Sequence, residues 1–97
     1  MSDRESKSAQ RREVHYRGHV QGVGFRYLVR QLATGYEVTG YVRNLPDGRV
    51  QLVVEGAASE LTRFQDAIAA KMAAYVRDAA VDVRPATGEL AGFEVRY

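Results

Sequence analysis

The chain has 97 residues, of which 45% are hydrophobic and 27% are charged, a composition typical of one globular domain. Its formal net charge of +2 is too small to indicate a nucleic-acid-binding protein, and the absence of cysteine excludes disulfides, a thiolate nucleophile and a zinc–thiolate site. No apolar run is long enough to cross a membrane or to form the core of a signal peptide. We therefore expect a cytoplasmic protein without a membrane attachment.

The beginning of the chain predicts a flexible tail followed by a strand. Residues 1–12 are polar, mixed in charge and poor in large apolar side chains, so they offer little to a hydrophobic core. From Glu13 to His19, apolar and polar residues alternate, which predicts the first strand. We expect residues 13–97 to form the folded domain.

A glycine-rich loop, residues 18–24, leads into a predicted helix. Apolar residues recur at helical spacing from Phe25 to Tyr36, and Gly35 is expected to end this helix in a left-handed conformation. The helix has no Ser, Thr, Asp or Asn as an N-cap and no acidic residue in its first turn, which instead carries Arg26. A cation at the positive end of the helix dipole is unfavourable unless a ligand brings negative charge. The loop therefore predicts a phosphate-binding site.

Two strands joined by a tight turn come next. Alternating patterns over residues 38–45 and 49–55 predict the strands. Between them, Pro46, Asp47 and Gly48 favour a tight turn, because proline fixes its own φ and the next two residues tolerate the positions that follow. This pattern is typical of an antiparallel hairpin.

The remainder predicts a second helix and two short strands. The helix is expected to use Ser59 as its N-cap and to present an apolar face as far as Tyr75. Residues 81–85 and 93–97 are expected to be short strands, which could also pair as a hairpin at one edge of the sheet.

The order of these elements, β-α-β-β-α-β, predicts an α+β fold, the ferredoxin-like split β-α-β sandwich. In this fold each β-α-β unit leaves a gap between its two strands, and a strand of the other unit fills it. We expect an antiparallel sheet with two helices on one face.

Two segments of the sequence resemble the signature motifs of the acylphosphatase family. They are GHVQGVGFR at residues 18–26 and GYVRNLPDGRV at residues 40–50, and the resemblance extends from Val14 to Tyr97. Acylphosphatases are small cytoplasmic enzymes that hydrolyse the carboxyl–phosphate bond of acyl phosphates, so the resemblance implies this activity here. The family usually has a glycine near residue 37, where the first helix leads into the next strand, and here the glycine is Gly35. The chain also lacks the Gly-Pro that often follows the second helix. Neither departure touches the motifs.

The resemblance also implies the roles of particular residues. Arg26 would bind the phosphoryl group, and Asn44 would position the attacking water. The phosphate cradle would be completed by the backbone amides of Gln21, Gly22, Val23, Gly24, Phe25 and Arg26. The residue types suit this chemistry, because phosphoryl transfer from a good leaving group depends mainly on positioning and charge stabilisation.

The expected partner is a small-molecule acyl phosphate, with inorganic phosphate or sulfate as competing anions. We expect a monomer that needs no metal or cofactor and binds no nucleic acid or membrane. His15 and His19 are the only histidines, and they lack carboxylates at metal-ligand spacing. A further hypothesis is that the terminal carboxylate, carried by Tyr97, orients the guanidinium of Arg26.

Two other classes of protein are compatible with the same order of elements. One is a non-catalytic acylphosphatase-like module that binds phosphate or carbamoyl phosphate, as in larger carbamoyl-transfer proteins of hydrogenase maturation. Those proteins carry zinc-finger cysteines, and this sequence has none. The other is an RNA-binding sheet, which would carry aromatic residues in its third strand, whereas residues 49–54 contain none.

Overall fold

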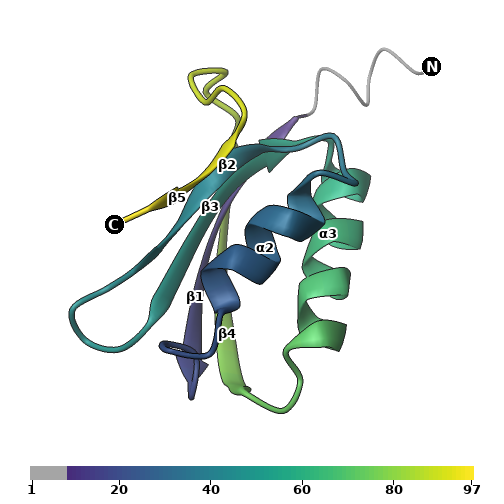
Figure 1. Ribbon diagram of the computed structural model, residues 1–97. Coiled ribbons are helices and arrows are strands. Elements are labelled where there is room, and N and C mark those ends of the chain that lie inside the picture. Colours follow the sequence, from purple (N-terminus) through teal and green to yellow (C-terminus); the bar gives the residue numbers. More distant parts are fainter. Residues whose placement is uncertain (1–8) are drawn as a thin grey trace.

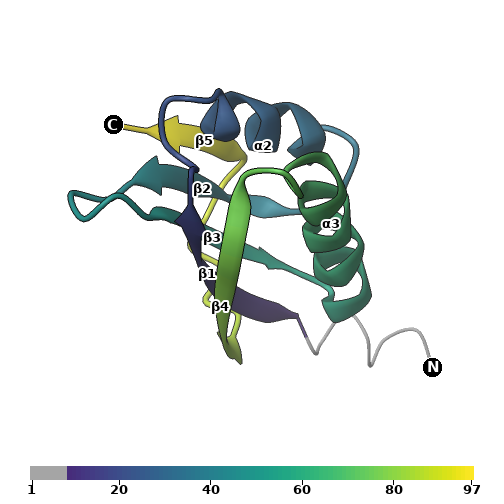
Figure 2. The same cartoon turned by 90° about the horizontal axis from the view of Figure 1, so that it is seen from below.

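The computed structural model describes residues 9–97, which form a five-stranded sheet with two helices on one face (Figure 1). The strands are β1 (Gln10–Gly18), β2 (Thr39–Asn44), β3 (Val50–Gly56), β4 (Val76–Pro85) and β5 (Phe93–Arg96). The helices are α2 (Phe25–Ala33) and α3 (Ala58–Lys71), and the view from below shows both of them over the same face of the sheet (Figure 2).

The order of the strands confirms the split β-α-β arrangement. The sheet runs β4-β1-β3-β2-β5, so β3 fills the gap between β1 and β2, and β1 fills the gap between β3 and β4. β1 is antiparallel to both of its neighbours, and β2 is antiparallel to β3. β5 is parallel to β2, so the sheet is mixed rather than wholly antiparallel.

The last two strands do not form the hairpin that the sequence also allowed, because β4 and β5 lie at opposite edges of the sheet. β4 completes the second crossover beside β1, where it pairs over nearly its whole length. The connection of residues 86–92 then returns the chain to the far edge, beside β2. Short strands that are adjacent in sequence need not be neighbours in a sheet.

The first strand begins at Gln10, earlier than the predicted Glu13. Arg11 and Arg12, expected in the tail, are therefore part of the sheet and pair with both β3 and β4. The alternation of apolar side chains starts later than the backbone pairing does, which explains the error. The rest of the expected tail, residues 1–8, lies outside the described part of the chain.

The predicted ends of both helices also need correction. Helix α2 ends at Ala33, and Thr34 closes it in a right-handed conformation, so Gly35 is not a left-handed cap. Helix α3 follows Ala57 without a side-chain cap, so Ser59 lies inside its first turn.

Helix α3 stops at Lys71, and β4 begins at Val76, earlier than the strand predicted at residue 81. The Tyr75 carbonyl accepts a hydrogen bond of 2.9 Å from the His19 N–H, which joins the start of β4 to the end of β1. No helix within residues 9–97 has the length and apolar character needed to span a bilayer.

The core lies between the helices and the sheet, and it fixes the start of α2. Phe25, the first residue of α2, is 2% exposed, and its ring centre lies 5.0 Å from that of Tyr16 on β1. On the other side, Phe64 of α3 meets Phe93 of β5 edge to face at 5.8 Å. Phe93 and Val95 pack against this core. The contact of Phe25 with Tyr16 holds the N-terminus of α2 against β1.

On the face opposite the helices, a buried carboxylate holds the connection between β4 and β5. Glu55 of β3 is 5% exposed, and it accepts hydrogen bonds from the N–H of Thr87 (2.9 Å), the hydroxyl of Thr87 (2.8 Å) and the N–H of Gly88 (3.0 Å). Arg11 also donates to it at 3.2 Å. Burial by itself would raise the pKa of Glu55, but these donors outweigh burial and hold that pKa below its usual value.

Candidate active site

The glycine-rich loop between β1 and α2 adopts the sharp turn that its glycines allow. Gly22 and Gly24 each have a φ of 79°, in the left-handed region that favours glycine. A Cβ atom at either position would meet no other atom within 4 Å, so backbone conformation rather than crowding requires glycine. Val20 and Phe25, at the two ends of the turn, are 1% and 2% exposed and anchor it to the core.

The backbone amides of residues 21–26, in this loop and at the start of α2, lack an acceptor among the described residues. Within residues 9–97, none of the N–H groups of residues 21–26 donates a backbone hydrogen bond. Helix α2 has no side-chain N-cap and no acidic residue in its first turn, as predicted. N–H groups without an acceptor at the positive end of a helix dipole form a natural binding site for an anion.

Gln21 has a second role that sequence reasoning missed. Its side-chain Nε2 donates to the carbonyl of Leu45 at 2.8 Å and to the carbonyl of Arg49 at 3.0 Å. These bonds fasten the loop to the turn between β2 and β3, and so to the end of β2 that carries Asn44. The sequence gives no direct signal of this contact, because its partners lie in a distant turn.

Arg26 is held by the last residues of the chain. Its Nη1 donates to the carbonyl of Arg96 at 3.2 Å, and its guanidinium carbon lies 4.7 Å from the centre of the Tyr97 ring. The hydroxyl of Tyr97 is 2.6 Å from that of Tyr27, and this hydrogen bond is the main cause that raises the pKa of Tyr97 above its usual value.

The hypothesis that the C-terminal carboxylate orients the guanidinium of Arg26 is therefore wrong. Among residues 9–97, the ion pairs do not include one between Arg26 and the C-terminal carboxylate. A carbonyl oxygen and an aromatic face orient the guanidinium instead, because alternation along β5 turns Tyr97 toward α2.

The loop, Arg26 and Asn44 meet around one cavity of about 170 Å³. Its lining is formed by Val20, Gly22, Gly24, Phe25, Arg26, Tyr27 and Asn44. A water molecule in the liquid occupies roughly 30 Å³, so the space suits a group of a few heavy atoms. Of the predicted loop, Gln21 and Val23 do not line the cavity; Gln21 contacts the hairpin and Val23 packs on the core.

Asn44, at the end of β2, makes none of the side-chain hydrogen bonds found within residues 9–97. Its amide can therefore accept one hydrogen bond from a small molecule in the cavity and donate another. In the same part of the chain, His, Asp and Glu side chains do not gather in groups of three that could hold a metal ion. Arg26 is the charged residue in the lining of the cavity.

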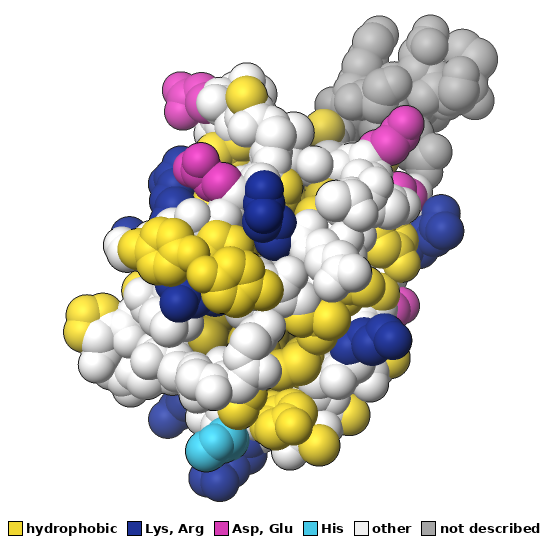
Figure 3. All heavy atoms as spheres, viewed as in Figure 1, with side chains coloured by type: hydrophobic (Ala, Val, Ile, Leu, Met, Phe, Trp, Pro, Cys, Tyr) yellow, Lys and Arg dark blue, Asp and Glu magenta, His cyan; other side chains and the backbone are white. Residues whose placement is uncertain are grey.

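The surface around the cavity combines aromatic and basic side chains. Tyr27 is 56% exposed and Tyr97 is 86% exposed. On the face shown in Figure 3, hydrophobic side chains gather where β5 passes over the start of α2, with Lys and Arg side chains beside them. A small anionic compound with an organic part would find both kinds of contact here.

The fold and the loop together define a class, a small ferredoxin-like α+β domain with a glycine-rich loop and acceptor-free amides at the N-terminus of its first helix. The family model described as Acylphosphatase matches residues 12–95. This chain belongs to the acylphosphatase family.

Individual relatives agree with that assignment. An acylphosphatase from Trichormus variabilis is 48% identical over 86 residues, which cover 86% of this chain and 82% of the relative. The crystal structure of acylphosphatase from Bacillus subtilis matches with a TM-score of 0.81 and 30% identity, over 91% of this chain and 99% of that one. The crystal structure of T. kodakarensis HypF also matches, at 29% identity and a TM-score of 0.78, over 91% of this chain but only 12% of HypF.

Proposed function

We propose that this protein is an acylphosphatase in which Arg26 and the amides of residues 21–26 bind the phosphoryl group and Asn44 orients the attacking water. Membership of the family supports the activity. The observation that carries the site assignment is the meeting of acceptor-free amides, Arg26 and Asn44 around one small cavity. The substrate is a small molecule, an acyl phosphate.

Hydrolysis of an acyl phosphate requires stabilisation of charge on the phosphoryl group rather than protonation of the leaving group. A carboxylate is a good leaving group, so it needs no proton donor as it departs. The guanidinium of Arg26 and the loop amides can neutralise the charge on the three equatorial phosphoryl oxygens. Both are in place before substrate arrives, because Arg96 and Tyr97 hold Arg26 while the core holds the loop.

In the proposed step, the oxygen of a water molecule attacks phosphorus as the bond between phosphorus and the acyl oxygen breaks. The acyl group leaves as a carboxylate with the electron pair of that bond. One proton of the water passes to a phosphoryl oxygen, which yields inorganic phosphate. Asn44 accepts a hydrogen bond from the water and fixes its approach, but an amide cannot remove the proton itself.

A second function, a module that binds phosphate or carbamoyl phosphate without hydrolysis, is favoured by one observation. The chain is about as similar to a small segment of HypF as it is to the acylphosphatase from Bacillus subtilis. Hydrolysis and binding therefore have to be measured separately.

The decisive experiment measures hydrolysis of acetyl phosphate and benzoyl phosphate by the purified protein, with a phosphate monoester as the control substrate. Binding of inorganic phosphate is measured on the same sample by calorimetry. Hydrolysis of the acyl phosphates alone supports the enzyme, whereas phosphate binding without hydrolysis favours the module. Absence of both would refute the proposed site.

Three further expectations from the sequence accompany this function. Inorganic phosphate and sulfate should compete with the substrate, the protein should be a monomer, and it should be found in the cytoplasm. Inhibition kinetics, sedimentation and cell fractionation test them independently of one another.

A further inference from the structure

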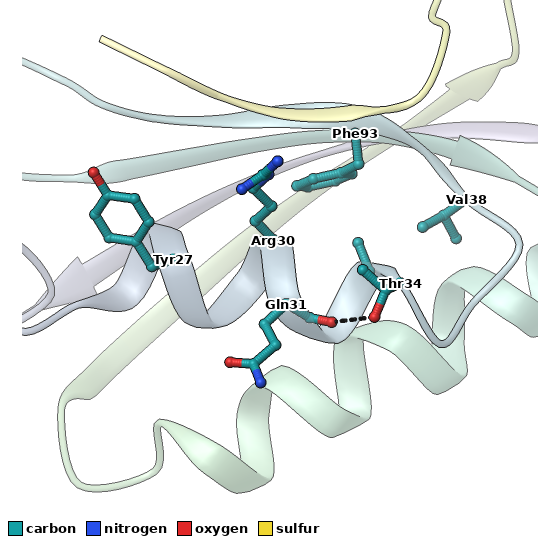
Figure 4. Close-up of a pocket in the computed structure, with 7 residues that line it drawn as sticks. Tyr27, Arg30, Gln31, Thr34, Val38 and Phe93 are labelled. Carbon is teal, nitrogen blue, oxygen red and sulfur yellow. Dashed lines mark hydrogen bonds between the residues drawn. The ribbon is translucent and has the colours of Figure 1, made fainter.

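A second cavity, of about 570 Å³, lies between α2 and β5. Tyr27, Arg30 and Thr34 contribute to it from one side of α2, and Phe93 contributes from β5. Figure 4 shows the Arg30 side chain rising from α2 toward β5, with its guanidinium beside the Phe93 ring and Tyr27 one turn earlier on the helix.

This cavity adjoins the candidate active site. Tyr27 lines both the larger cavity and the smaller one that contains Arg26. Arg30 follows Arg26 by four residues, so the two arginines share a face of α2 and are about 6 Å apart along its axis. A short molecule that is bound at Arg26 by one end can therefore reach Arg30 with the other.

Arg30 has a positive charge that the described part of the chain leaves without a counter-ion. Within residues 9–97 it takes part in neither the ion pairs nor the side-chain hydrogen bonds. The lining of the larger cavity includes no Asp or Glu. The hydroxyl of Thr34 already donates to the Gln31 carbonyl at 2.7 Å, and the Gln31 amide points away from β5 (Figure 4), so Arg30 is the side chain that offers donors to an anion here.

One candidate for a competing anion is Glu94, which lines a smaller neighbouring cavity together with Arg30. Glu94 alternates with Phe93 and Val95, so its side chain leaves β5 on the face away from α2. Its carboxylate accepts a hydrogen bond from Nε of Arg96 at 2.7 Å. Arg30 is therefore available to an anion from outside the protein.

We propose that Arg30 forms a second anion subsite that selects small acyl phosphates whose acyl chain ends in a carboxylate or another anionic group, an inference that rests on the proposed acylphosphatase function. The phosphoryl group binds at Arg26, the acyl chain crosses Tyr27, and the distal anion meets the Arg30 guanidinium. The Phe93 ring forms an apolar wall beside the methylene groups.

The test uses two phosphonates that are not hydrolysed and that differ only at their far end. 3-Phosphonopropionate ends in a carboxylate, and propylphosphonate ends in a methyl group. We expect the wild type to bind 3-phosphonopropionate roughly two- to fivefold more tightly, the range of an exposed charge pair, as measured by calorimetry. The preference should decline at high salt, because salt screens exposed charges.

Two matched variants assign the preference to Arg30. Arg30→Gln should remove it while leaving the affinity for propylphosphonate unchanged. Arg77→Gln changes the net charge equally but lies on β4, at the opposite edge of the sheet, and should keep the preference. Acetyl phosphate is too short to reach Arg30, so its hydrolysis should be equal in the wild type and in Arg30→Gln.

Equal binding of the two phosphonates by the wild type would overturn the subsite. Equal loss of the preference in Arg30→Gln and Arg77→Gln would also overturn it, since net charge would then be the cause. The outcome is separate from the proposed function, because binding needs no turnover. A wild type that shows the preference but does not hydrolyse acetyl phosphate would retain the subsite and lose the enzyme.

Discussion

Two turns of this molecule contain glycines with similar φ angles. The amides of one turn are hydrogen-bonded to a carboxylate of the protein, whereas the amides of residues 21–26 in the other are not. Gly22 and Gly24, in the loop before α2, have a φ of 79°, and Gly88, in the connection between β4 and β5, has a φ of 73°. In the second turn the amides of Thr87 and Gly88 donate to the Glu55 carboxylate. In the first turn the amides of residues 21–26 donate no backbone hydrogen bond within the described residues.

The difference is the one expected between a structural turn and the proposed phosphate-binding loop. A turn that only connects two strands can receive its anion from within the chain, and Glu55 supplies it in a buried position. The loop before α2 keeps its donors free and adds Arg26 beside them, which costs stability unless an external anion binds. The comparison predicts that changes in the first loop will impair activity, whereas changes at Glu55 will reduce stability.

The largest effect is expected for Arg26→Ala. Arg26 would contact the phosphoryl group both before and during the reaction, so turnover should fall by roughly 10³-fold or more and inhibition by inorganic phosphate should weaken. Arg26→Lys should also be poorly active, because an ammonium group cannot reproduce the planar fork of a guanidinium. Turnover numbers and phosphate inhibition constants test this, with Arg77→Ala as the control. A variant that still binds phosphate normally would place the anion elsewhere.

Asn44→Ala should affect turnover and not binding. If Asn44 orients the water, its loss should lower turnover by about 10²–10³-fold, as for other positioned hydrogen-bonding groups. The phosphate inhibition constant should stay close to that of the wild type. If Asn44→Ala loses phosphate affinity as severely as Arg26→Ala, Asn44 belongs to the phosphate cradle and the water-orienting role is wrong.

Glu55→Gln tests the other turn. Four hydrogen bonds reach a buried charged group here, so we expect the free energy of unfolding to fall by about 2–3 kcal/mol, measured by urea denaturation. Turnover of the folded variant should be unchanged. The exposed Glu89→Gln should change stability by less than about 0.5 kcal/mol. A large loss of activity at full stability in Glu55→Gln would contradict the comparison.

The same carboxylate predicts a pH dependence of stability. The folded-state pKa of Glu55 lies below the ordinary value of 4.5, so its stabilisation is present above that pH and is lost as the pH falls through the folded-state pKa. The wild type should therefore lose stability over this acidic range more steeply than Glu55→Gln does. Parallel curves for the two proteins would show that Glu55 is not held as an anion.

A matched pair of glycine substitutions should sharpen the comparison. Gly24 and Gly88 both have positive φ and open space around the missing Cβ atom, so Gly24→Ala and Gly88→Ala should each lose about 1–2 kcal/mol of stability. Only Gly24→Ala should weaken phosphate binding, because only that turn would hold an external anion. Calorimetry and thermal unfolding of the two variants give both quantities.

The smallest effect is expected from chelation. Arg26 and the loop amides are proposed to carry the whole charge of the phosphoryl group, so excess EDTA should leave acyl phosphate hydrolysis unchanged. An activity that disappears with EDTA and returns with magnesium or zinc would mean that the phosphoryl group is bound by a metal ion as well as by Arg26 and the loop amides.

Local signals in the sequence were sufficient for most of the helices and strands. The turn at residues 45–48 forms as predicted, with the Leu45 N–H donating to the Arg49 carbonyl at 2.8 Å. Strand β4 was harder to predict from the sequence. Within Val76–Pro85, only Val81 and Val83 gave an alternating apolar signal, so the strand was expected to begin at residue 81. Its exposed, charged residues look like a loop, and backbone pairing with β1 makes them a strand.

By itself, the sequence determined the order of elements, the glycine loop without a cap and the presence of Arg26 and Asn44, because each depends on neighbouring residues or on a short motif. The tertiary structure alone decided that Glu55 serves the turn at Thr87, that Arg96 and Tyr97 hold Arg26, and that Arg30 faces a cavity without acids. These contacts join residues far apart in the chain, and strand order and register bring them together. Local spacing carries no information about that register.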